Sequence, residues 1–310
     1  MKINKKAQKI LKCSGRVVAS KDKFDIVDCQ KCGFIHILPL IETDESQEFY
    51  SNKFYQKETK DYIKRHVNDY EWLSIEYNEK YDLFDKNLKR NRQKRILDIG
   101  SGPGLFLKVG EKRGWEVLGF EPGKPAYHFS KNELNLNIKN EFFDRKTFNK
   151  YGRFDVVHLN NVIEHILDPI DMLTMATEVL EEGGLICVTC PNDFNPLQLI
   201  VVEHLKKDKW WVVPEHHINY FNICSLKNLF NNLGLVVFYE TASFPLELFL
   251  LMGEDYIGND KVGRKMHKYR MKMEKVFNDS NNNDFKRKIF DQFAEIGIGR
   301  ELTMIGKKND

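Results

Sequence analysis

Short apolar runs alternate with amphipathic stretches along the central part of the chain, from Arg95 to Ser243. The runs are rich in Val, Ile, Leu and Phe, which is typical of buried strands. Strands are predicted at 95–99, 115–121, 137–143, 154–160, 185–190 and 235–243, and a last strand is expected at 301–308. Strands that alternate with helices indicate a parallel sheet with right-handed crossover connections. We therefore expect an α/β fold.

The helices between these strands carry ordinary boundary signals. Asp168-Pro169 predicts an N-cap followed by proline in the first turn, and Gly183-Gly184 is expected to end that helix. Ser225 is expected to cap a later helix, which Gly234 closes.

Segments with other patterns flank this region. Residues 13–40 consist of short extended runs that contain cysteines, and residues 244–300 are expected to be helical. Residues 56–92 are also expected to be helical, because apolar positions recur there at steps of three and four. That apolar stripe consists of Leu73, Tyr77, Tyr81, Phe84 and Leu88. We expect an N-terminal ribbon-like segment over 1–55, a helical linker or cap over 56–92, and a main domain over 93–310 that contains a helical insertion at about 244–300.

Charge and composition narrow the class of protein. The 48 basic and 45 acidic residues give a net charge of +3, which is too balanced to indicate nucleic acid or membrane binding. The sequence has no apolar run long enough for a membrane span, and its start lacks the apolar core of a signal peptide. Six cysteines in 310 residues do not form a secreted disulfide scaffold. We expect a cytoplasmic protein that acts on a small molecule.

The most informative segment is RILDIGSGPGLFL, at residues 95–107, where a buried strand runs into closely spaced glycines. Gly100, Gly102 and Gly104 would let backbone N–H groups approach a ligand at the start of a helix. Asp98 places a carboxylate at the end of the strand, and Glu121 follows the next strand, where an acid can accept both ribose hydroxyls. A nicotinamide or flavin dinucleotide site would need G-x-G-x-x-G, and the third glycine does not have that spacing.

The acid-G-x-G-x-G pattern resembles motif one of class I methyltransferases. FDVVHLNNVIEHILDPIDML and LEEGGLICVTCPN resemble segments of the ubiquinone-type O-methyltransferase superfamily, and PEHHINYFNICSLKNLFNNLGL resembles its segment before the sixth strand. The resemblance covers about residues 90–243. It implies a Rossmann-like, doubly wound sheet of seven strands whose last strand is antiparallel, and S-adenosylmethionine (S-adenosyl-L-methionine) as the cofactor.

The resemblance also implies positions for the cofactor site. Its adenine would lie near Phe142, Phe143 and Asp144, and its methionine end near Asn160 and Asn161. The full set of expected cofactor residues is Asp98, Gly100, Ser101, Gly102, Gly104, Glu121, Pro122, Phe143, Asn160 and Asn161.

Histidines are the candidates for the catalytic base, because a hydroxyl acceptor must lose its proton during methyl transfer. The resemblance favours His217, in the loop WWVVPEHHINYF, with His165 as the second candidate. His165 equally suits a structural role in its turn. His216 is expected near the acceptor, facing away from its neighbour His217. A divalent ion at Glu164-His165 is a further alternative, although two adjacent ligands make a poor site.

The sequence predicts the chemical class of the acceptor molecule but not its identity. Trp210 and Trp211 are candidates for a wall that stacks on the acceptor. The overall pattern resembles methyltransferases of bacterial polysaccharide clusters, which implies O-methylation of a sugar, nucleotide-sugar or related precursor. C- or N-methylation of a sugar or secondary metabolite is an alternative. A cofactor-binding interaction module without catalysis is another, and the intact acidic and glycine positions argue against it.

The N-terminal cysteines suggest a degenerate zinc ribbon. Cys13, Cys29 and Cys32 are spaced as C-x15-C-x2-C, whereas a zinc ribbon normally supplies four ligands. CQKCGFIHILPL resembles the second half of the ribbon that related methyltransferases carry. Either His36 completes a structural zinc site, or the segment keeps the ribbon shape without metal. Cys187 and Cys190 are expected in the core.

Overall fold

The computed structural model describes residues 13–40 and 61–309. The predicted N-terminal ribbon (1–55) and helical cap (56–92) therefore fall partly outside the described residues, at 1–12 and 41–60. No helix in the described ranges is long and apolar enough to cross a membrane.

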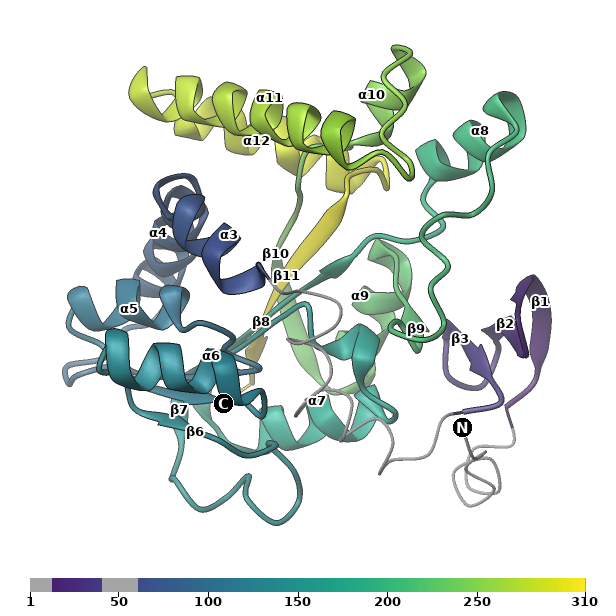
Figure 1. Ribbon diagram of the computed structural model, residues 1–310. Helices are drawn as coiled ribbons and strands as arrows, with labels where there is room; N and C mark the ends of the chain where they lie inside the picture. Colours follow the sequence, from purple (N-terminus) through teal and green to yellow (C-terminus); the bar gives the residue numbers. More distant parts are fainter. Residues whose placement is uncertain (1–12, 41–60, 310) are drawn as a thin grey trace.

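A seven-stranded sheet forms the centre of the protein (Figure 1). Its strand order is β10-β11-β8-β7-β4-β5-β6, and only β11 runs antiparallel to its neighbours β10 and β8. The strands are β4 Arg95–Ile99, β5 Glu116–Phe120, β6 Ile138–Lys139, β7 Phe154–Asn160, β8 Leu180–Pro191, β10 Leu235–Ala242 and β11 Glu301–Lys308. The expected Rossmann-like α/β fold with an antiparallel last strand is confirmed.

Helices cover both faces of this sheet, as alternating strands and helices require. On one face, α7 (Pro169–Glu178) and α9 (Ile223–Asn232) contribute Leu173, Leu226 and Phe230 to the larger core cluster. On the other face lie α4 (Tyr70–Asn87) and α5 (Leu105–Lys112). There Tyr81 and Phe106 stack at 4.8 Å between ring centroids. Shorter elements on this side are α3 Tyr62–Asn68, α6 Lys124–His128 and the π-helix Phe129–Glu133. The 3-10 helix Ile163–His165 instead contacts α7, and its Ile163 belongs to the larger core cluster.

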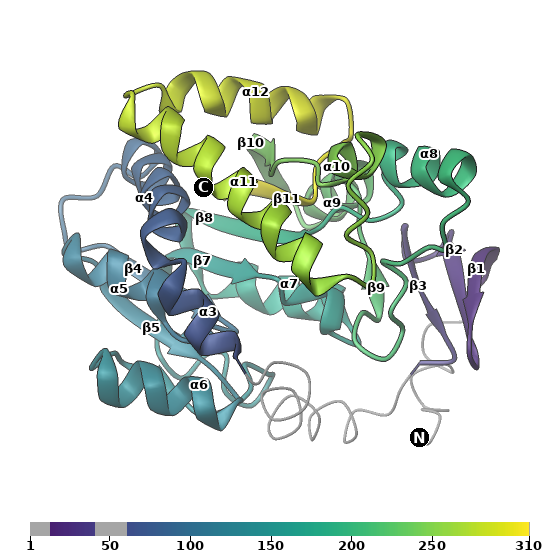
Figure 2. The same cartoon turned by 45° about the horizontal axis from the view of Figure 1, so that its top comes forward.

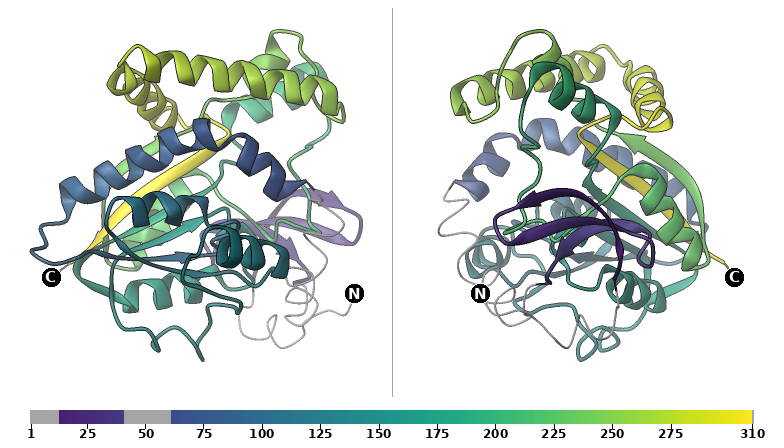
Figure 3. Two further views of the ribbon diagram at one scale, coloured as in Figure 1. Left: turned by 60° about the vertical axis from the view of Figure 1, so that its left-hand side comes forward. Right: turned by 90° about the vertical axis from the view of Figure 1, so that its right-hand side faces the viewer.

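A second sheet of four strands stands beside the main one (Figure 3, right). It contains β1 (Gly15–Lys21), β2 (Phe24–Cys29) and β3 (Phe34–Leu38), with β9 (Asn219–Tyr220) as its fourth strand. The extended character of residues 13–40 was predicted. The fourth strand was not, because two residues that pair across the chain leave no local signal.

Three helices connect β10 to β11, within the predicted insertion. They are α10 Glu247–Leu251, α11 Asp260–Asp279 and α12 Asn283–Glu295, and α8 (Pro196–Leu205) lies beside α10. The helix α12 packs on β10, and α11 contacts α4, so that α11 runs across one end of the sheet (Figure 2).

Several predicted boundaries were wrong. Gly183-Gly184 does not end a helix, since α7 ends at Glu178 and both glycines lie in β8. The register between β7 and β8 shifts there, and a Cβ at Gly184 would lie 2.8 Å from the Glu181 carbonyl oxygen. Ser225 is not the N-cap of α9. Asn222 is, and Ser225 is the third residue of its capping box.

The predicted strand 137–143 is reduced to Ile138–Lys139. The side chain of Asn140 ends it by donating to the carbonyl oxygens of Glu121 at 2.9 Å and Pro122 at 3.1 Å. These contacts take the place of a continued ladder beside β5. Two other signals were correct: Asp168 caps α7 by accepting from the Asp171 N–H at 2.9 Å, and Gly234 follows α9 with a positive φ of 72°.

Candidate active site

A cavity of about 810 Å³ opens where the ends of β4, β5 and β7 meet the helices α3, α4 and α11. One part of its lining comes from the glycine turn and the residues after β5, β6 and β7. The other part comes from two helical regions: Tyr62–Tyr77, which precedes β4, and Tyr256–Arg270, which lies between β10 and β11. Ligands of open α/β sheets bind at this carboxyl end of the strands.

The glycine turn requires glycine for two different reasons. Gly100, Gly102 and Gly104 have φ values of 71°, 50° and 75°, which side chains other than glycine rarely adopt. Gly100 and Gly102 line the cavity, and a Cβ on Gly102 would point at the Tyr62 hydroxyl from 3.4 Å. Gly104 does not line the cavity, because it packs closely on Leu136. The turn therefore presents bare backbone to the cavity.

Glu121 ties the glycine turn to the next strand. It follows β5, its side chain is buried, and it lines the cavity together with Pro122. Its Oε2 accepts the N–H of Gly102 at 2.8 Å, and its Oε1 accepts the N–H of Gly123 at 2.6 Å. A carboxylate has about four acceptor positions, so the same group can also accept from a ligand hydroxyl.

Asp98 and Ser101 lie below the turn and outside the cavity lining. Oδ1 of Asp98 is 2.7 Å from Nδ1 of His158, and both side chains are buried. Burial lowers the pKa of His158, so its neutral imidazole donates Nδ1–H to the carboxylate. The carboxylate at the strand end therefore supports the turn through His158, instead of facing the cavity as we expected.

Of the three residues expected near the adenine, two line the cavity and one does not. Phe142 and Phe143 line the cavity, and Phe143 packs against Phe120 with 5.3 Å between ring centroids. Asp144 lies outside the lining, where its Oδ1 accepts the N–H groups of Lys146 and Thr147 at 2.8 and 3.1 Å. Asp144 thus stabilises the turn that follows the two phenylalanines.

Asn160 and Asn161, at the end of β7, both line the cavity. Asn161 has a positive φ of 54°, which is uncommon outside glycine, and its Nδ2 donates to Oε1 of Glu301 at 2.9 Å. Glu301 is the first residue of β11 and lines the cavity as well. Sequence reasoning missed Glu301, because only the antiparallel insertion of β11 beside β8 brings it to this place.

Of the two candidate bases, only His165 lines the cavity. Its Nδ1–H donates to the carbonyl oxygen of His216 at 2.7 Å, which leaves the lone pair on Nε2. Burial lowers the pKa of His165 to about 4. The ring of His217 lies 5.0 Å from that of His165, outside the cavity lining, and burial lowers its pKa well below the usual range.

The loop that carries His216 and His217 is a turn, whereas an extended segment was predicted. The N–H groups of both histidines bond to the carbonyl oxygen of Val213, at 2.9 and 2.8 Å. The argument that neighbours in an extended strand face opposite sides therefore does not apply. His216 does not line the cavity, but its carbonyl oxygen accepts the Nδ1–H of His165, which does line it.

Glu164 joins His165 and His217 in a group whose ligand atoms lie within 4.8 Å of one another. Oε1 of Glu164 is 3.6 Å from Nε2 of His165, and burial raises the pKa of Glu164 well above its usual range. Mg²⁺ prefers oxygen ligands, whereas two imidazole nitrogens and one carboxylate oxygen are donors that suit Zn²⁺ or Fe²⁺. A divalent ion at Glu164 and His165 therefore stays a prediction, as an alternative to a base at His165.

Trp210 and Trp211 are placed differently from the expected acceptor wall. They lie outside the cavity lining and belong to the cluster between the four-stranded sheet and α8, with Ile26 and Ile37. Trp211 is buried, and its ring lies 5.5 Å from that of Phe194. In the structure the two tryptophans hold the second sheet in place.

The cavity wall that we expected Trp210 and Trp211 to form consists instead of helical residues that the sequence analysis did not single out. Trp72 and His267 line the cavity with 5.3 Å between their rings, and Nε2 of His267 is 3.1 Å from Oδ2 of Asp69. Nε1 of Trp72 donates to Glu274 at 2.9 Å. These contacts join the junction of α3 and α4 to α11, nearly 200 residues further along the chain. The aromatic and charged composition of DYIKRHVNDYEW, at 61–72, is the one signal that could have indicated this surface.

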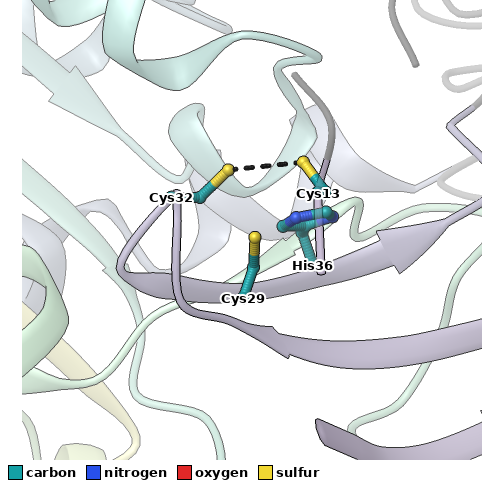
Figure 4. Close-up of side chains that lie close together, drawn as sticks. All are labelled: Cys13, Cys29, Cys32 and His36. Carbon is teal, nitrogen blue, oxygen red and sulfur yellow. Dashed lines mark hydrogen bonds between the residues drawn. The ribbon is translucent and has the colours of Figure 1, made fainter. Parts of the chain in front are cut away.

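The three N-terminal cysteines meet His36 at one end of the second sheet (Figure 4). The ligand atoms of all four side chains lie within 4.8 Å of one another, and Sγ of Cys13 is 3.7 Å from Sγ of Cys32. Zn–S bonds of about 2.3 Å in a tetrahedral site would place two sulfurs about 3.8 Å apart. Nδ1–H of His36 donates to the Ile37 carbonyl at 2.9 Å, while its buried Nε2 makes no ordinary hydrogen bond within the described residues. The four residues fit a zinc ion.

Comparisons with known proteins agree with this geometry. Residues 71–240, more than half of the chain, match a family model described as a methyltransferase domain. The ubiquinone biosynthesis O-methyltransferase of Ruegeria sp. strain TM1040 is 34% identical over 114 residues, which cover 34% of this chain and 46% of that protein. The protein of the same name from Cereibacter sphaeroides is 36% identical over 113 residues, 35% of this chain and 46% of its own length. The chain thus spans about half the length of the curated relatives it matches.

Two solved structures of the plantazolicin methyltransferase BpumL have a similar fold. The complex with SAH has a TM-score of 0.50 at 14% identity, and it covers 86% of this chain and 94% of its own. The complex with SAH and a monoazolic desmethylPZN analog has a TM-score of 0.50 at 16% identity, with the same coverage. The family match, the relatives and the seven-stranded sheet agree, and the chain belongs to the methyltransferase domain family, as a class I S-adenosylmethionine-dependent methyltransferase.

Proposed function

We propose that the protein transfers a methyl group to a hydroxyl of a small-molecule acceptor, a sugar, nucleotide-sugar or related precursor of a polysaccharide. The observation that carries this proposal is the composition of the cavity. One wall contains the glycine turn and Glu121, and the other contains aromatic and charged side chains of α3, α4 and α11. A cofactor and an acceptor can therefore lie side by side in one cavity, as in-line transfer requires.

The cofactor residues act through the backbone and one carboxylate. S-adenosylmethionine, when bound, supplies the electrophilic methyl group. The bare backbone at Gly100 and Gly102 leaves room for its methionine portion, Glu121 accepts its ribose hydroxyls, and Phe142 and Phe143 contact its adenine. Asp98 and Ser101 support the turn from below, where their side chains are buried.

We assign the role of base to His165 in preference to His217. Nε2 of His165 carries the lone pair and belongs to a residue that lines the cavity, whereas His217 lies behind it. The bond from Nδ1 to the His216 carbonyl fixes both the ring and its tautomer. The acceptor proton moves to Nε2 while the acceptor oxygen displaces the sulfur from the methyl group, so that S-adenosylhomocysteine is the leaving group.

The acceptor wall is consistent with a sugar. Tyr62, Trp72 and Tyr256 offer ring faces, and Asp69 and Glu301 offer carboxylates beside them. Aromatic faces with neighbouring hydrogen-bonding groups suit a ring that bears hydroxyls.

Mass spectrometry of the product tests this function. The full chain is incubated with methyl-labelled S-adenosylmethionine and a metabolite extract, and labelled products are identified. A labelled methyl ether on a sugar or sugar nucleotide is expected. A labelled methyl group on carbon or nitrogen would show C- or N-methylation in place of O-methylation. Cofactor binding without any labelled product would favour an interaction module.

We further propose that Cys13, Cys29, Cys32 and His36 bind one structural zinc ion. The observations that support it are the 3.7 Å sulfur separation and the buried Nε2 of His36. Zinc in such a site supplies a cross-link between strands. The four residues would join the start of β1, the end of β2, the turn after it, and β3.

A further inference from the structure

Two arginines of the cavity lining have no partner among the described residues. Arg65 lies on α3 and Arg264 on α11, and both line the cavity. Neither makes an ion pair or a side-chain hydrogen bond with any residue in 13–40 or 61–309. Both are exposed to solvent, so water and a ligand can reach them.

No acid of the described lining forms an ion pair with Arg65 or Arg264, and this includes Asp260, which lies one turn before Arg264 on α11. Three of the other acids have different partners. Asp69 bonds to His267 at 3.1 Å, Glu76 to Lys80 at 2.8 Å, and Glu301 to Asn161 at 2.9 Å. Arg270, the third arginine of the lining, is also engaged, since it lies 4.6 Å from the centre of the Trp72 ring and 3.9 Å from Glu274. Arg65 and Arg264 are thus the cations of the described lining that are available to a ligand.

An available guanidinium recognises a particular chemistry. Its planar fork of N–H groups matches the oxygens of a phosphate, and such charge-assisted bonds are roughly twice as strong as neutral ones. Two guanidinium groups on different helices can bind separate oxygens of a single phosphate or of a diphosphate. Tyr62, on the same helix as Arg65, contributes an aromatic ring to the same cavity.

We propose that Arg65 and Arg264 bind a phosphate group of the acceptor, so that the enzyme methylates a phosphorylated small molecule. This inference rests on the proposed methyl transfer and specifies its substrate class. The phosphate lies at the exposed arginines, and the remainder of the acceptor extends past Tyr62 and Trp72 toward His165. The phosphate belongs either to a nucleoside diphosphate or to a simple phosphate ester.

Calorimetry with the full chain saturated with S-adenosylhomocysteine tests the inference. The probes are inorganic pyrophosphate, uridine diphosphate and uridine. Pyrophosphate and uridine diphosphate are expected to bind, with an affinity that falls as salt rises, whereas uridine binds at least tenfold more weakly than uridine diphosphate. Arg65→Ala and Arg264→Ala are each expected to lower the affinity for pyrophosphate and for uridine diphosphate by roughly tenfold or more, since each removes a charge-assisted contact. Arg264→Lys should lose less of this affinity than Arg264→Ala, because lysine keeps the positive charge.

Lys272→Ala is the matched control, because Lys272 lies on α11 two turns beyond Arg264 and outside the cavity lining. It should change the affinities less than twofold. An equal loss in Lys272→Ala and Arg264→Ala would overturn the proposal, since it would show non-specific attraction. Equal binding of uridine and uridine diphosphate, or no binding of either phosphate probe, would also overturn it.

Two further readings separate this inference from the proposed function. If S-adenosylhomocysteine itself fails to bind the wild-type chain, the proposed function fails. If it binds and the phosphate probes do not, only the phosphate inference fails. If Arg65→Ala lowers the affinity for S-adenosylhomocysteine and leaves the affinity for pyrophosphate unchanged, Arg65 binds the cofactor and its assignment to the acceptor phosphate is wrong. Strong pyrophosphate binding compared with uridine diphosphate would support a simple phosphate ester as the source.

Discussion

Nδ1 of His158 lies 2.7 Å from Oδ1 of Asp98, directly below the glycine turn of the cavity. Asp98→Ala removes the acceptor of a buried N–H and should lower the free energy of unfolding by about 1–3 kcal/mol. Because the turn loses its support, affinity for S-adenosylhomocysteine should fall as well. Urea denaturation and calorimetry measure the two effects. In Asp98→Asn the amide oxygen can still accept from His158, so a loss equal to that of Asp98→Ala would contradict this account.

Glu121→Gln should weaken cofactor binding by about tenfold or more, since hydrogen bonds to a charged group contribute about 1.5–3 kcal/mol. The variant keeps one oxygen for the Gly102 N–H and loses the negative charge. Calorimetry with S-adenosylhomocysteine measures the change. Glu141→Gln is the control, because Glu141 lines the same cavity and bonds instead to the Tyr151 hydroxyl at 3.0 Å. Equal affinity of wild type and Glu121→Gln would remove Glu121 from the cofactor site.

His165→Ala should lower turnover by about 10², the lower end of the contribution of a general base, because a low pKa makes His165 a weak base; cofactor affinity should change little. His217→Ala should cost less, since His217 does not line the cavity. Steady-state rates on the identified acceptor decide between them. A larger loss in His217→Ala would restore His217 as the base. Normal turnover in both variants would indicate an acceptor that needs no base.

The rate should depend little on pH between about 6 and 8. Burial lowers the pKa of His165 to about 4, so its neutral, basic form already predominates above pH 5. A base with the usual histidine pKa of about 6.5 would instead make the rate rise through this range. The pH profile of kcat measures the difference, and a rise with a midpoint near 6.5 would contradict the assignment.

The same shift predicts a pH-dependent stability. The pKa of His165 is lower in the folded chain than the unfolded value of about 6.5, so its contribution is complete above pH 6.5 and is lost as the pH falls toward 4. Between pH 7 and pH 5, wild type should lose about 1–2 kcal/mol relative to His165→Gln, which does not titrate. Urea denaturation of both proteins at each pH measures this difference. A constant difference would show that His165 keeps an ordinary pKa.

One zinc ion per chain is expected by elemental analysis, and Cys29→Ser combined with Cys32→Ser should remove it. Cys224→Ser is the control, because Cys224 is exposed and lies outside the cluster. Chelation should lower the melting temperature of wild type and leave that of the double variant unchanged. Zinc that persists in the double variant would place the ion elsewhere, and wild type without zinc would contradict the proposal.

Local signals account for what the sequence predicted well. The strands at 154–160 and 301–308 coincide with β7 and β11, because each contains several apolar residues and most of its positions are buried in the sheet. The glycine turn could be located because Gly100 and Gly102 are adjacent to the strand they follow. The family was identified on these same segments.

The acceptor side of the cavity could not be predicted, because its contacts join distant parts of the chain. Asp69 meets His267 across 198 positions, and Asn161 meets Glu301 across 140. The tryptophans were assigned to the acceptor because aromatic residues beside a histidine suit both a binding wall and a core. Trp211 is buried against the second sheet, so it is a core residue. The sequence could not show this, because burial depends on which distant segments pack together.

The second sheet has a consequence for the order in which the protein is made. Its strand β3 pairs with β9, where His36 lies opposite Asn219, and the Ile37 N–H bonds to the Ile218 carbonyl at 3.0 Å. The N–H of Ile218 in turn bonds to the carbonyl of Glu164, beside His165. During synthesis on the ribosome, β1, β2 and β3 therefore emerge long before β9. The pairing of β3 with β9, and with it the link from Ile218 to the histidine turn, can form only after the later segment has been made.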